Sequence, residues 1–241
     1  MLEKTKGIVL HQIKYTDSGI VAHLYTRKFG RLPVLVKGMR KRKTGKHSIM
    51  FQPMSVLDIE MYYKPSKEMQ LLKEFSLSWI SYELNSDIRK SSVALFLGEV
   101  LSSVLKEESP HEEMFDYIER SIAWFDGCNG NYANFHIAFL TGLTSYLGIQ
   151  PVLSHDGGGA IFDMRNGRFV NVPPVHNDYS PAVVAGILAA FFQTPFERSG
   201  DISLSGRMRN EVLETIIRYY SLHLPTLRKI NSLEVLREVF G

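Results

Sequence analysis

The sequence changes its apolar periodicity near residue 80, and this change constrains the fold more than any other feature. From residue 7 to about 78, β-branched and aromatic residues alternate with polar ones, and turn-forming residues interrupt them at 17–19, 29–30 and 64–67. About five short strands without intervening helices are too few for a two-sheet sandwich and cannot form a parallel sheet. The pattern therefore predicts a small closed β-barrel of the OB type over residues 1–80.

Beyond residue 80 the apolar residues recur at helical spacing. Helices are predicted at about 88–106, 110–127 and 132–147, and further ones begin near Ser180, Ser205 and Asn231. Gly148 is typical of a helix C-terminus. The fold class is thus α+β, with a barrel at 1–80 followed by an all-α domain at 81–241.

A β-hairpin insert is predicted within the helical domain, at about 157–172. Alternating apolar residues flank Asn166-Gly167, a dipeptide that favours a two-residue type I′ turn. Ile161, Phe162 and Phe169 are expected to hold this hairpin against the helices.

The two parts of the chain differ in charge. Residues 1–80 hold 15 Lys and Arg against 6 Asp and Glu, whereas the remaining 13 basic and 19 acidic residues make the rest acidic. A basic module joined to an acidic one indicates that the first part meets a polyanion and the second meets another partner.

Nine cations without a compensating acid lie between residues 27 and 46. A solvated charge run is one interpretation. Nucleic-acid binding is favoured over it, because such a density repels itself unless an anion neutralises it. The cluster would contact phosphates and would not read sequence. Its members are Arg27, Lys28, Arg31, Lys37, Arg40, Lys41, Arg42, Lys43 and Lys46.

Two further groups are candidates for binding. Tyr62 and Tyr63 point to opposite faces of a strand, so at most one is buried and either is a candidate platform for stacking a base. In the helical domain, a basic and aromatic group is either a set of helix-surface charges or a groove for an acidic peptide or for more DNA. Its candidate contact residues are Arg207, Arg209, Arg218, Tyr220 and His223.

The sequence offers little for catalysis. Cys128 is the single cysteine, the eight histidines have no metal-site spacing, and no Gly-x-Ser-x-Gly motif or pair of catalytic carboxylates occurs. We therefore expect that the protein is not an enzyme and binds no cofactor. No apolar run of about 18 residues is present, so a cytoplasmic protein without membrane contact is expected.

Several blocks, in their order and spacing, resemble the bacterial recombination mediator family RecO over nearly the whole chain. No block is decisive alone, but the ordered series is specific. The blocks are Lys6–Leu10, Tyr15–Gly19, Leu24–Gly30, Val36–Arg40, Phe51–Met54, Leu147–Pro151, Tyr220–His223 and Ser232–Leu236.

The resemblance implies a function in recombinational DNA repair. Members of this family bind single- and double-stranded DNA through an OB fold and anneal complementary strands. They contact the acidic tail of single-stranded-DNA-binding protein and, with RecR, help to load RecA; they are not enzymes. An OB-type RNA-binding or ribosome-associated protein is the alternative, and a protein-binding scaffold is a weaker one.

In one respect the chain departs from the family pattern. Many members carry a four-cysteine zinc module after the segment that matches Leu147–Pro151, whereas this chain has the Asn166-Gly167 hairpin there and no cysteine. We therefore expect the hairpin to be held without metal.

Overall fold

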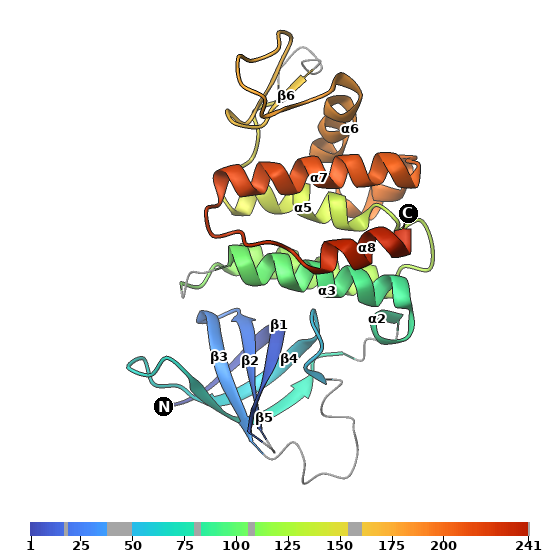
Figure 1. The fold of residues 1–241 in the computed structure, drawn as a ribbon. Coiled ribbons are helices and arrows are strands. Elements are labelled where there is room, and N and C mark those ends of the chain that lie inside the picture. The colour runs from blue at the N-terminus through green and yellow to red at the C-terminus, as the bar shows by residue number, and fades with distance from the viewer. Residues whose placement is uncertain (17–18, 38–49, 80–82, 106–108, 154–160, 241) are drawn as a thin grey trace. The chain divides into compact units, whose positions relative to one another are not determined.

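The computed structural model describes the chain except residues 17–18, 38–49, 80–82, 106–108, 154–160 and 241 (Figure 1). The chain forms two compact units. The barrel unit comprises Met1–Asp126 and Ile230–Leu236, and the helical unit comprises Gly127–Lys229 and Arg237–Gly241.

Five strands of the barrel unit close into a barrel in the order β1-β2-β3-β5-β4. All neighbours are antiparallel except β3 and β5, which run parallel. This order is that of a five-stranded Greek-key barrel, so the predicted barrel is confirmed. The strands are β1 (Leu2–Thr16), β2 (Gly19–Thr26), β3 (Gly30–Lys37), β4 (Val56–Tyr62) and β5 (Gln70–Leu77).

The alternation in the sequence determines which side chains fill the barrel. In β3, Leu32, Val34 and Val36 are buried while the residues between them point outward. Phe51 meets Phe75 edge-on in the core, with ring centroids 4.9 Å apart. β1 pairs with both β2 and β4 along its 15 residues, and register shifts at Val9/His11 and Lys14/Thr16 allow it to bend around the barrel.

Helices cover one side of the barrel within the same unit. They are α2 (Glu83–Ser86), α3 (Ile88–Val104) and α4 (Glu112–Gly127). α3 packs against β1, and a Cβ on Gly98 would lie only 2.9 Å from the Leu10 carbonyl oxygen, so glycine permits this close approach. Glu99 of α3 accepts hydrogen bonds from the backbone nitrogens of Asn231 and Ser232, where α8 (Ser232–Phe240) begins.

The helical unit is built from α5 (Phe135–Tyr146), α6 (Ala182–Gln193) and α7 (Gly206–His223), with a 3-10 turn, η1 (Phe196–Asp201). Ser205 caps α7 by accepting a hydrogen bond from the Met208 backbone, as its position before the helix predicts. Gly148, just after α5, has φ +69°, which confirms its predicted role at that helix end.

A three-stranded sheet in the order β7-β6-β8 lies in the helical unit; its strands are β6 (Ile161–Asp163), β7 (Arg168–Val170) and β8 (Tyr179–Ser180). The predicted hairpin is present, although residues 157–160 of the insert lie outside the described residues. Its predicted type I′ turn is wrong: β6 pairs Asp163 with Arg168, so four residues connect the strands. Of these four residues only Gly167, with φ +61°, has a positive φ. The Asp163 carboxylate accepts from the Asn166 backbone nitrogen and side-chain amide, which fixes the longer loop.

Among the described residues, no helix is both long and apolar enough to cross a membrane.

Candidate nucleic-acid interface

Within the barrel unit, acidic residues neutralise the cations that follow β2. The Arg27 guanidinium lies 3.1 Å from a carboxylate oxygen of Asp116 and 3.5 Å from one of Glu112, both on α4. Lys28 forms an ion pair with Glu3 on β1. These two predicted DNA contacts therefore already have anionic partners within the fold.

Arg31 holds the end of a helix. Its guanidinium donates to the carbonyl oxygens of Ser102 (2.8 Å) and Leu105 (2.9 Å), at the C-terminus of α3. The last carbonyls of a helix lack intrahelical partners and carry partial negative charge, so a cation stabilises them. Arg31 is thus placed to join the barrel to α3.

Two neutral histidines lie beside Arg31. The rings of His11 and His23 stack with their centroids 4.2 Å apart, and His11 Nδ1 is 2.8 Å from the Ser102 hydroxyl. Burial, followed by the nearby His23 and Arg31, lowers the pKa of His11 to about 4. Burial and Arg31 also lower the pKa of His23. This face of the barrel therefore carries little free positive charge at neutral pH.

A groove of about 480 Å³ opens at the other end of β3, where the strand finishes at Lys37. Lys37, Lys64 and Lys67 line it, and within the described part of the chain none of the three makes an ion pair. Among the residues that the structure describes, none that lines the groove is acidic. Its remaining lining residues are Leu35, Tyr62, Met69, Gln70 and Leu71.

Gln70 fixes the turn that carries two of these lysines. Its side-chain oxygen accepts from the Lys64 backbone nitrogen (2.8 Å), and its amide nitrogen donates to the carbonyls of Lys64 (3.1 Å) and Lys67 (2.6 Å). The Lys67 nitrogen also donates to the Lys64 carbonyl (3.0 Å), which closes a β-turn with Pro65 at its second position. Both lysines therefore project from a preformed backbone.

Packing and exposure distinguish the two tyrosines. Tyr63 stacks on Phe29 with ring centroids 4.2 Å apart and packs against the barrel core. Tyr62 is 46% exposed and lines the groove. Tyr62 is thus the available stacking platform, and Tyr63 is a packing residue.

Of the four cluster members that the structure describes, Lys37 lines the groove and Arg27, Lys28 and Arg31 do not. Arg40, Lys41, Arg42, Lys43 and Lys46 lie outside the described residues. Neither Lys64 nor Lys67 stands out in the sequence, because each lies beyond the dense basic run. The signal for them is the turn Lys64-Pro-Ser-Lys67, with a lysine at each end.

In the helical unit, most of the predicted basic and aromatic group has internal partners. Arg209 donates to the Asn134 side-chain oxygen (2.8 Å) and to the carbonyls of Leu204 and Phe240 (3.2 Å each). Tyr220 is fully buried, and its hydroxyl donates to the Leu140 carbonyl at 2.6 Å.

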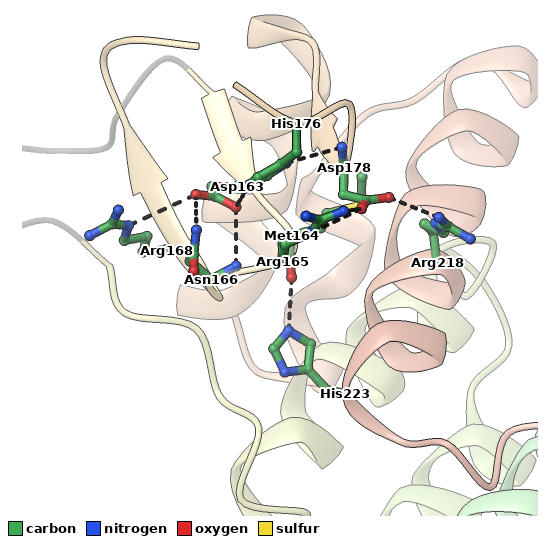
Figure 2. Close-up of polar contacts among 9 residues, drawn as sticks. All are labelled: Asp163, Met164, Arg165, Asn166, Arg168, His176, Asp178, Arg218 and His223. Carbon is green, nitrogen blue, oxygen red and sulfur yellow. Dashed lines mark hydrogen bonds and ion pairs between the residues drawn. The ribbon is translucent and has the colours of Figure 1, made fainter. Parts of the chain in front are cut away.

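Arg218 and His223 support the small sheet (Figure 2). Arg218 donates to Asp178 at 2.8 Å, and the same carboxylate accepts from Arg165 at 2.7 Å. His223 Nε2 lies 2.8 Å from the Met164 carbonyl oxygen. Arg207 differs from the others, because its guanidinium pairs with Glu211, one turn along α7, and its side chain is 90% exposed.

Asp163 is the centre of a second set of contacts in this sheet (Figure 2). Besides Asn166, the carboxylate has His176 Nε2 at 3.2 Å and Arg168 Nε at 3.9 Å. Burial acts to raise the pKa of Asp163, but the Asn166 hydrogen bonds and the nearby His176 and Arg168 side chains hold it below its usual value. The rings of Phe162 and Phe169 stack on each other, and both contact Phe192 of α6, as predicted for packing against the helices.

The donor set here does not fit a zinc module. Within the described ranges, no group of three or more His, Cys, Asp and Glu residues is placed to hold a metal ion. Hydrogen bonds, ion pairs and aromatic contacts hold the small sheet.

A closed five-stranded barrel whose described residues line one groove with lysines and no acid is an arrangement found in nucleic-acid-binding proteins. Comparison with known families agrees with this class. Residues 1–79 match the family model described as recombination protein O N terminal, and residues 85–234 match recombination protein O C terminal.

Similar proteins match over the full length of the chain. The DNA repair protein RecO of Phocaeicola vulgatus is 37% identical over 242 residues, and that of Bacteroides fragilis is 36% identical over 241, each covering 100% of both chains. The RecO protein of Flavobacterium psychrophilum is 30% identical and covers 99% of both. The chain belongs to the RecO family of DNA repair proteins, which are recombination mediators and not enzymes.

Proposed function

We propose that this protein binds single- and double-stranded DNA through the groove at the end of β3 and anneals complementary strands. The observation that carries the proposal is the set of three lysines, Lys37, Lys64 and Lys67, which line one groove without acidic partners among the described residues. Unneutralised cations gain free energy by displacing counterions from phosphates. Cations that already have carboxylate partners gain less.

The basic segment that follows Lys37 in the sequence belongs to the DNA track in the proposal. Its cations are Arg40, Lys41, Arg42, Lys43 and Lys46, which come within nine residues of Lys37, the last residue of β3. Phosphate contacts carry no sequence information. Arg27, Lys28 and Arg31 belong to the proposed track as secondary contacts, because the fold already uses their charges.

Annealing follows from charge neutralisation. Two complementary strands repel each other through their phosphates, and a protein that neutralises both lowers this barrier. We propose that the protein performs this step in the cytoplasm on nucleoid DNA, and that with RecR it helps to load RecA onto strands coated by single-stranded-DNA-binding protein. The RecO family membership supports DNA and RecR as partners.

A strand-annealing assay tests the function directly. The purified protein should accelerate annealing of complementary oligonucleotides at low salt, both bare and coated with single-stranded-DNA-binding protein. Changing Arg40, Lys41, Arg42 and Lys43 together to Ala should slow annealing and weaken binding to unrelated DNA sequences by similar factors. No acceleration by the wild-type protein would refute annealing, and a strong preference for RNA over DNA of equal length would favour an RNA-binding role.

The helical unit is the proposed site for the acidic tail of single-stranded-DNA-binding protein. Of the predicted residues, Arg207 has the most exposed guanidinium, Arg218 is 58% exposed, and Arg209, Tyr220 and His223 support the surrounding structure. Titration of an acidic, Phe-terminated peptide into the full chain should show binding that Arg207→Glu weakens. Arg198→Glu is the matched control, because Arg198 is a 72% exposed arginine paired with Asp201 in the same unit. Equal loss in both variants would contradict a contact at Arg207.

A further inference from the structure

The groove at the end of β3 contains more than phosphate binding requires. Three lysines form its charged rim, but Leu35, Met69 and Leu71 supply an apolar floor and Tyr62 an aromatic wall. Phosphate oxygens gain nothing from apolar carbons. A ligand that uses the whole groove must carry both negative charge and an apolar face.

The apolar floor is on the outside of the barrel. Leu35 and Leu71 are register partners on β3 and β5, and both are half-buried residues that alternate with core residues such as Val34 and Leu72. An outward position next to lysines would ordinarily carry a polar side chain. Two adjacent leucines at this place indicate a surface that a ligand covers.

Tyr62 differs from the buried tyrosines of this chain in its hydroxyl. Tyr219 and Tyr220 each donate to a backbone carbonyl, at 2.5 and 2.6 Å, whereas the Tyr62 hydroxyl makes no hydrogen bond to any described residue. The ring is 46% exposed, and Tyr62 pairs with Leu71 of the floor in the β4–β5 register. Its strand position is therefore fixed while one side of the ring is accessible.

We propose that this groove binds single-stranded nucleic acid by stacking one unpaired base on Tyr62 over the Leu35 and Leu71 floor, with the flanking phosphates on Lys37, Lys64 and Lys67. This inference rests on the proposed DNA binding and assigns a specific contact within it. A volume of about 480 Å³ is in the range of pockets that hold small molecules, and one nucleotide fits it. A duplex keeps its base faces stacked inside, so it reaches the lysines and leaves the ring and floor unused.

Preorganisation favours this use of the groove. The three hydrogen bonds of Gln70 fix the turn that carries Lys64 and Lys67, so little conformational entropy is lost in the backbone on binding. Tyr62 thus makes the groove distinguish single strands from duplexes. The lysines bind the phosphates by charge.

Equilibrium binding of one oligonucleotide, as a single strand and as a duplex, tests the proposal with the full-length protein. Tyr62→Ala should weaken single-strand binding about tenfold, which is within the range for loss of one stacked base, and should leave duplex binding near the wild-type value. Tyr62→Phe should keep wild-type binding, because it retains the ring. An oligonucleotide with abasic residues should bind the wild-type protein more weakly and should not distinguish it from Tyr62→Ala.

Tyr15→Ala is the matched control, since Tyr15 is 56% exposed on the same barrel but does not line the groove. It should bind both DNA forms as the wild type does. Ultraviolet cross-linking to an oligonucleotide that contains 5-iodouracil should yield an adduct on Tyr62.

Three results would overturn the inference: an equal loss of single-strand and duplex binding in Tyr62→Ala, no loss at all, or a loss of single-strand preference in Tyr15→Ala alone. Failure of the underlying DNA-binding proposal is distinguishable. In that case Lys37→Ala, Lys64→Ala and Lys67→Ala combined would also leave both DNA forms bound at wild-type affinity.

Discussion

The two ends of β3 use positive charge in different ways. Near its start, Arg27, Lys28 and Arg31 bind carboxylates or helix-end carbonyls of the same unit. At its end, Lys37 and the lysines of the β4–β5 turn line a groove in which no described residue is acidic.

In the sequence, the two ends of β3 are equally basic, because the basic residues run from 27 to 46 without an acid. Folding separates them. The helices α3 and α4 bring Glu112, Asp116 and two helix-end carbonyls to the first group, whereas no acidic side chain of the described chain lines the groove. The density of cations along a sequence therefore indicates less about binding than the partners that each cation has after folding.

The largest expected effect comes from reversing the charge at the groove. Changing Lys37, Lys64 and Lys67 together to Glu should weaken single-strand binding on the order of 1,000-fold at about 0.1 M salt, because three phosphate contacts become three repulsions. Fluorescence anisotropy measures the affinity, and circular dichroism should show an unchanged fold. A loss below about tenfold would mean that the strand lies elsewhere.

At the other end of β3, Arg31→Ala should affect stability more than DNA binding. Losing two charged hydrogen bonds to the α3 carbonyls should lower the free energy of unfolding by about 2 kcal/mol. Urea denaturation measures this, with Arg31→Lys as a variant that keeps the charge and loses the two-pronged geometry. DNA affinity of the folded Arg31→Ala protein should fall only slightly, as expected for a secondary contact, and a fall as large as that of the groove variant would contradict the difference between the two ends of β3.

Acidification should lower the free energy of unfolding through the histidines that lie beside Arg31 on the barrel. The unfolded chain binds the proton of a histidine at about pH 6.5, whereas folded His11 does so at about 4. The unfolded state therefore takes up more protons between these values, and the free energy of unfolding falls as the pH is lowered through this window. His11→Gln should flatten the dependence in urea titrations at several pH values, and an unaltered slope would assign the effect to other groups.

The smallest effects are expected at Arg27 and Lys28. Exposed ion pairs contribute less than about 1 kcal/mol, so Arg27→Ala and Lys28→Ala should each change stability by less than that. Single-strand affinity should fall much less than in Lys37→Ala, Lys64→Ala or Lys67→Ala. Losses equal to those at the groove would show that carboxylate partners do not prevent a lysine or arginine from binding DNA.

Local patterns predict the architecture because they act over a few residues. Strand alternation identifies Val34 and Val36 as core residues, and Gly148 ends its helix as expected. The hairpin turn was harder to predict, because Asn166-Gly167 fits a two-residue turn as well as a longer one. The carboxylate of Asp163 decides between them through hydrogen bonds that the dipeptide alone does not reveal.

The groove was only partly predictable, because long-range pairing builds it. Parallel pairing of β3 with β5 brings Leu35 beside Leu71, and the β4–β5 turn adds Lys64 and Lys67 to the end that carries Lys37. Alternation shows that Tyr62 and Tyr63 face opposite ways, but which of them is exposed depends on the packing of Tyr63 on Phe29. Likewise, nothing in the sequence near Arg31 shows that the end of α3 lies within reach of it.

The salt dependence of single-strand binding directly tests whether Lys37, Lys64 and Lys67 neutralise DNA phosphates. For the wild type and for the combined Lys37→Ala, Lys64→Ala and Lys67→Ala variant, the logarithm of the affinity is measured against the logarithm of salt concentration. The slope of the variant should be shallower by about 2, since each lost phosphate contact contributes about 0.7 for single strands. An unchanged slope would contradict the claim that these three lysines neutralise DNA phosphates.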